Sequence, residues 1–122
     1  NLSGQTLHDL DTMREEVKAR LGDAKFKAAR HLGDHTLLLT GLFPESLRRQ
    51  RHDSDVDSHL AYCVQGKRAY RVAADLTDQA QDPPSADVLM TLSRHFEMCA
   101  YGLRETRRAW ETDDHGRKLL IN

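Results

Sequence analysis

The sequence predicts an all-α fold, an up-and-down bundle of about four helices in a single domain. Of the 26 Leu, Ile, Val and Phe residues in this 122-residue chain, 17 are Leu, whereas five are Val and one is Ile. Leucine favours helices and β-branched residues favour strands. The apolar residues also recur every three or four positions within long polar segments. This spacing places them on one face of a helix, and short connections favour antiparallel neighbours.

The first two predicted helices span about residues 5–21 and 24–42. In the first, Leu7, Leu10, Val17 and Leu21 recur at helical spacing and are expected to enter the core. Gly22-Asp23 resembles a helix stop followed by a helix start. Gly33-Asp34 offers a second break, but a continuous helix is favoured there. Pro44 ends the segment, because a residue before proline is pushed out of the α region.

The third and fourth predicted helices span about residues 55–78 and 86–112. Asp55 and Asp57 lie in the first turn of the third, where the helix dipole favours carboxylates, and Ser85 is the expected N-cap of the fourth. The apolar positions of the third are Val56, Leu60, Cys63, Val64, Ala69, Val72 and Leu76. Those of the fourth are Leu89, Leu92, Phe96, Cys99, Leu103, Thr106 and Trp110, which form a heptad-like seam.

Cys63-x-x-Gly66 in the third helix is echoed by Cys99-x-x-Gly102 in the fourth. If these helices are antiparallel, each sulfur lies within about 2 Å of the level of the opposite glycine, at a rise of about 1.5 Å per residue. We therefore expect each thiol to fill the hollow above that glycine. The same geometry separates His59 and His95 by about 15 Å along the bundle, which argues against a shared zinc ion.

Composition excludes several functional classes. The formal net charge of -1 and the pI near 6.7 indicate no binding surface for nucleic acid or anionic lipid. No apolar run approaches the roughly 20 residues of a membrane span, and two cysteines are too few for a secreted disulfide scaffold. A cytoplasmic protein with free thiols is expected. Because the first residue is Asn, we expect an N-terminally trimmed chain or fragment.

No catalytic motif is apparent. The sequence contains neither a G-x-S-x-G nucleophile elbow nor a glycine-rich phosphate loop. This favours a protein without catalytic activity or cofactor.

Two candidate sites remain. His31 and His35 lie four residues apart on one helical face, a metal-ligand spacing, although Leu32 stands where zinc proteases place a glutamate. An exposed or capping histidine pair is the alternative interpretation. Arg48, Arg49 and Arg51 form a basic patch that could meet a phosphate or an acidic partner, and a solvated loop is the alternative.

The run G-D-H-T-L-L-L-T-G-L-F-P-E, followed by A-Y-C-V-Q-G-K-R-A-Y and L-S-R-H-F, resembles a group of bacterial all-helical proteins of unassigned activity. They share a run ending in G-F-F-P-E, then Y-Y-x-x-G-K-x-A-Y, then an amphipathic helix. The resemblance covers about residues 24–110 and implies a helical fold and a bacterial origin, but it supplies no catalytic residue that can be carried over to this chain. Ala is common in the group at Gly33, which favours continuity there. Leu42 and Ala61 replace aromatic residues of the group, which weakens the expectation of an aromatic ligand pocket.

The predicted function is a bacterial interaction or regulatory module without catalytic activity, with a protein partner or a second copy as its ligand. The seam of the fourth helix reaches Trp110, beyond what a four-helix core needs, so Trp110 is a candidate contact of a homodimer. Packing of Trp110 on the first helix is the alternative. The alternative function is a sensor that binds a small ligand in the bundle interior, or a metal at His31 and His35.

Overall fold

The computed structural model describes residues 2–45 and 55–117, with side chains at 9–45 and 59–113. The elements in chain order are α1 (Leu2–Gly41), α3 (Asp55–Asp75), the 3-10 turn η1 (Thr77–Gln79), α4 (Ala86–Arg94) and α5 (Phe96–Arg117). No strand occurs among the described residues. The predicted all-α bundle is confirmed.

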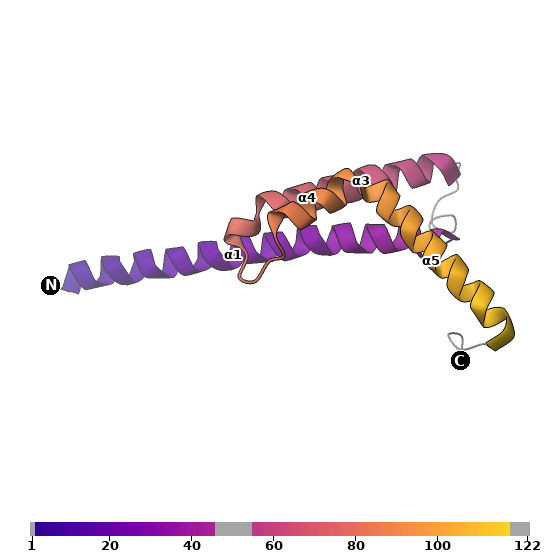
Figure 1. Cartoon of the computed structure of the whole chain (residues 1–122). Coiled ribbons are helices and arrows are strands. Elements are labelled where there is room, and N and C mark those ends of the chain that lie inside the picture. The colour runs from indigo at the N-terminus through magenta and orange to yellow at the C-terminus, as the bar shows by residue number, and fades with distance from the viewer. Residues whose placement is uncertain (1, 46–54, 118–122) are drawn as a thin grey trace.

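The helices differ in length and in how much of each is packed against the others. Helix α3 runs antiparallel to α1 along its C-terminal half, and α4 returns beside α3 (Figure 1). Helix α5 crosses the C-terminal end of α1 and then leads away from it, whereas the N-terminal half of α1 extends beyond the other elements (Figure 1). The fold is therefore a helical body from which the N-terminal half of α1 and the C-terminal part of α5 extend (Figure 1).

The predicted break at Gly22-Asp23 is wrong, because α1 is continuous from Leu2 to Gly41. Both residues instead serve a contact with the segment after α3. Gly22 is buried against the side chain of Gln79, and the Asp23 carboxylate accepts a 3.0 Å hydrogen bond from the backbone N–H of Gln81. Asp23 does accept a bond from a backbone N–H, as an N-cap would, but that N–H belongs to Gln81 in the connection between η1 and α4.

The predicted fourth helix, 86–112, is divided at His95. Ser85 is its N-cap as expected, and its hydroxyl accepts a bond from the Val88 N–H at 3.2 Å. His95 has φ -113° and ψ 31°, which ends α4, and α5 starts at the next residue in a new direction (Figure 1). This bend brings α5 to the end of α1, a tertiary contact that no residue near His95 signals.

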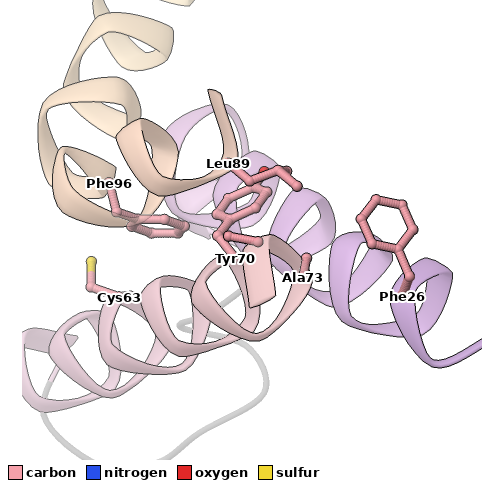
Figure 2. Close-up of a cluster of buried hydrophobic side chains, with 7 residues drawn as sticks. Phe26, Cys63, Tyr70, Ala73, Leu89 and Phe96 are labelled. Carbon is pink, nitrogen blue, oxygen red and sulfur yellow. The ribbon is translucent and has the colours of Figure 1, made fainter. Parts of the chain in front are cut away.

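The core depends on two aromatic rings packed against glycines. Tyr70 on α3 and Phe96 at the start of α5 have ring centroids 6.2 Å apart, and Leu89 lies beside them (Figure 2). A Cβ built on Gly33 would lie 2.8 Å from the Tyr70 ring, and one on Gly66 would overlap the Phe96 ring. The two glycines let α1, α3 and α5 approach around these rings.

The apolar face predicted for α3 mixes two sides of the helix. Cys63 and Ala69 are buried as expected, whereas Leu60, Val64 and Val72 are exposed. The buried face instead continues through Tyr70, Ala73 and Ala74. Apart from the large Tyr70, the buried side chains on this face are small, which lets the neighbouring helices pack closely.

The thiol-on-glycine prediction is wrong. Nothing lies within 4 Å of a Cβ built on Gly102, and the neighbour of Gly66 is Phe96, not Cys99. The bend at His95 changes the levels of residues in α5, so the straight-helix geometry does not apply.

Arginines from α5 complete the C-terminal end of α1. Arg104 donates to the Thr40 carbonyl at 3.2 Å, and Arg107 donates to the Leu42 carbonyl and to the Glu45 carboxylate, the latter at 2.8 Å. The last carbonyls of a helix have no partner within it, and its dipole favours cations there. These contacts fix the crossing of α5 over α1.

We expect Gly66→Ala to lower the free energy of unfolding by about 1 to 2 kcal/mol, because the fully buried Phe96 ring has no room to move. Gly102→Ala is the matched control, since its Cβ meets open space and alanine is the better helix former. It is expected to raise stability by up to about 1 kcal/mol. Urea unfolding measures both, and equal effects of the two substitutions would contradict the packing described.

Candidate interaction surface

The N-terminal half of α1 carries apolar side chains that nothing in the described structure covers. Leu10, Met13, Val17 and Leu21 are between 49% and 58% exposed. Leu10, Val17 and Leu21 were predicted to enter the core, and that prediction is wrong; the side chain of Leu7 lies outside the described part. Residues 9–21, termed the projecting segment, are exposed at every position, because α3 runs back only as far as the C-terminal half of α1 (Figure 1).

These side chains begin a longer apolar row. Spacings of three and four residues connect Leu10, Met13, Val17, Leu21, Ala24, Ala28 and Leu32, all exposed and here termed the outer stripe. The buried residues of α1, such as Phe26, Thr36 and Thr40, lie roughly 140° around the axis from it at 100° per residue. The outer stripe therefore follows the face of α1 that is turned away from the body.

The base of the projecting segment is anchored. Besides the bond from Gln81, Asp23 forms an ion pair of 3.0 Å with Lys27. The hydrogen bond from the Gln81 backbone, together with Lys27, lowers the pKa of the Asp23 carboxyl. The direction in which the projecting segment leaves the body is thus set at residues 22 and 23.

Charge along this part of α1 is divided into two blocks. Residues 9–16 carry four acidic side chains and one basic one, whereas residues 18–27 carry four basic side chains and one acidic one. The acidic block contains Asp9, Asp11, Glu15 and Glu16, with Arg14; the basic block contains Lys18, Arg20, Lys25 and Lys27, with Asp23. A partner lying along the stripe would meet opposite charges at its two ends.

The structure brings His31 and His35 together as the sequence predicted. Their rings stack with centroids 6.2 Å apart and planes inclined by 12°, and both residues are exposed. Among the described residues, however, no group of three or more His, Cys, Asp or Glu side chains could hold a metal ion. The pair therefore supplies two potential ligands on the outer face of α1.

His59 and Cys63 also form a pair, with Nε2 3.6 Å from Sγ. Burial raises the pKa of the Cys63 thiol and lowers the pKa of the His59 imidazole. Both shifts favour the neutral forms, whereas a catalytic cysteine acts as a thiolate beside a charged imidazole. Since Cys63 is only 2% exposed, the geometry favours a structural pair.

The remaining predicted contacts are not brought together. Arg48, Arg49 and Arg51 lie outside the described residues. Trp110 lies in the C-terminal half of α5 and is half-exposed. Met98 and Tyr101, the other large exposed side chains of α5, are three residues apart and share one side of that helix, whereas Trp110 lies about 120° to 180° around the axis from them at 100° per residue. Helix α5 therefore offers no continuous apolar row like that of α1.

No described helix is long and apolar enough to cross a membrane. Comparison of the chain with protein-family models, curated proteins and solved structures finds no match. The resemblance to a bacterial helical group thus remains a prediction, and the outer stripe must be interpreted from its own chemistry.

We expect the Asp23 carboxylate to stabilise the fold above about pH 4, its unfolded pKa. Because its folded pKa is lowered, this contribution is lost as the pH falls through that lower value. The difference in free energy of unfolding between the wild type and Asp23→Asn should therefore shrink as the pH is lowered below about 4 in urea titrations. The exposed Asp78, substituted in the same way, is the control; a wild-type to Asp23→Asn difference independent of pH would contradict the lowered pKa.

Proposed function

We propose that this protein is an interaction module that binds another polypeptide along the outer stripe of α1. The observation that supports this is the projecting segment itself, a helical stretch of residues 9–21 whose large apolar side chains are about half-exposed to solvent. Without tertiary packing, this stretch is stabilised only by its own helix propensity and by its continuity with the packed half of α1. Full burial of a Leu, Val or Met side chain contributes about 1.5 to 3 kcal/mol, so a covering partner would stabilise the segment and gain affinity.

The module is proposed to act in the bacterial cytoplasm and without catalytic activity. Cys63 and Cys99 are both free, which suits a reducing compartment. The bacterial origin rests on the sequence resemblance, and the neutral His59–Cys63 pair supports a non-catalytic role.

A metal-binding sensor is the second candidate, favoured by the stacked rings of His31 and His35. Two imidazoles leave a zinc ion short of the three or four protein ligands it usually has. The interaction module accounts for more of the exposed surface and is the better-supported proposal.

Native mass spectrometry of the protein, purified without chelator from the cells that produce it, tests both candidates at once. We expect a stoichiometric second polypeptide on the wild type. Val17→Asp places a carboxylate within the outer stripe and should release this polypeptide. Ala19→Asp is the matched control on the opposite side of the projecting segment, and should retain it.

Three outcomes would overturn the proposed interaction. These are a bare monomer, a polypeptide lost equally from both variants, and a metal adduct on a monomer that His31→Ala removes. The last of these would establish the sensor instead.

A further inference from the structure

We propose that the polypeptide bound by the outer stripe is a second copy of this chain, lying antiparallel to the first. This inference rests on the proposed function and adds the identity and orientation of the partner. It follows from two features of residues 9–27, the spacing of the apolar side chains and the order of the charges.

The apolar spacing is nearly symmetric about Val17. In an antiparallel pair crossing there, Leu10 is level with Ala24 of the other copy and Met13 with Leu21, because each pair lies equally far from Val17 in sequence. Val17 meets its own counterpart. The paired segments extend over about 27 Å at 1.5 Å per residue, and a self-complementary patch of this kind is what a two-fold dimer requires.

The charges select the antiparallel orientation. Antiparallel chains place the acidic block, residues 9–16, beside the basic block, residues 18–27, whereas parallel chains in register place each block beside its own kind. On the flanks of the stripe, Glu16 is then near Arg20 of the other copy, with Asp9 near Lys27 and Asp11 near Lys25. These three charge pairs are symmetric about residue 18, which is one residue from the apolar crossing point at Val17. The charges and the apolar side chains therefore indicate the same register to within one residue.

The rest of the fold leaves this face open. Helices α3 and α4 lie on the side of α1 opposite the outer stripe, and α5 contacts α1 near Thr40 and Gly41 (Figure 1). Two copies can therefore meet through α1 with their bodies directed outward and at opposite ends of the pair. The dimer would resemble a short antiparallel coiled coil with one body at each end.

Sedimentation equilibrium of the purified wild type measures self-association. We expect a dimer at micromolar concentration, weakened at least about 100-fold by Val17→Asp and little changed by Ala19→Asp. These residues are exposed, so the far-ultraviolet circular dichroism of the body should persist. A wild type that stays monomeric at about 100 μM would overturn the inference.

Disulfide trapping determines the orientation, in a Cys99→Ser background that removes the partly accessible native thiol. Met13→Cys and Leu21→Cys chains, mixed and mildly oxidised, should form the heterodimer in at least about tenfold excess over either homodimer. An excess of both homodimers would establish the parallel orientation, and an excess of one homodimer alone would establish an antiparallel crossing shifted toward its cysteine. Either result would overturn the proposed register.

A charge exchange tests the flanking pairs independently. Glu16→Lys should weaken the dimer by about 5- to 10-fold, because two exposed ion pairs are lost and become repulsive. Adding Arg20→Glu in the same chain should restore the affinity, since the two substituted side chains then face each other across the dimer with opposite charges. Failure of the second substitution to restore affinity would contradict this pairing.

The two proposals can fail separately. If native mass spectrometry finds a different protein on the outer stripe, released by Val17→Asp alone, the interaction module stands and the antiparallel dimer is wrong. If it finds a bare or metal-bound monomer, both are wrong.

Discussion

The close approach of three helices around two aromatic rings determines the rest of this structure. The Tyr70 ring lies over Gly33 of α1, and the Phe96 ring at the start of α5 lies over Gly66 of α3. A side chain at either glycine would displace these rings, and the fully buried Phe96 ring is surrounded by protein and has no free space to move into. Glycine within a helix costs about 1 kcal/mol relative to alanine. Here that cost is offset by the burial of two large rings.

Polar contacts hold the same interface in register. The Tyr70 hydroxyl donates to the Asp34 carboxylate at 2.6 Å, and burial together with this carboxylate raises the pKa of Tyr70. Toward the N-terminal end of the packed body, the Asp23 carboxylate accepts a hydrogen bond from the Gln81 backbone. At its C-terminal end, Arg107 donates to the Leu42 carbonyl, just beyond α1. Because these contacts lie between residues 23 and 45, in the C-terminal half of α1 and just after it, the packed body stops there and leaves residues 9–21 of α1 uncovered.

The contrast between the packed half of α1 and its uncovered half explains how much of the candidate site could be predicted from the sequence. The helical spacing of Leu10, Val17 and Leu21 was evident, as was the pairing of His31 with His35. Spacing identifies an apolar face but does not say what covers it, so the row was assigned to the core of its own chain. Met13 and the small residues Ala24 and Ala28 were missed for the same reason; the outer stripe becomes visible only once the opposite face of α1 is seen to be occupied.

The sequence by itself determined the helical class, the N-cap at Ser85 and the continuity of the helix through Gly33, because these depend on local propensity and on hydrogen bonds between near neighbours. Tertiary structure decided the continuity through Gly22 and Asp23, the bend at His95 and the exposure of the outer stripe. Gly22 and Asp23 have partners 57 and 58 residues away. A glycine or a capping residue looks identical in the sequence whether its structural partner is a near neighbour or a distant residue. Which apolar face is buried is likewise decided by the packing of distant helices, since helical periodicity is the same for a face in the core and a face in water.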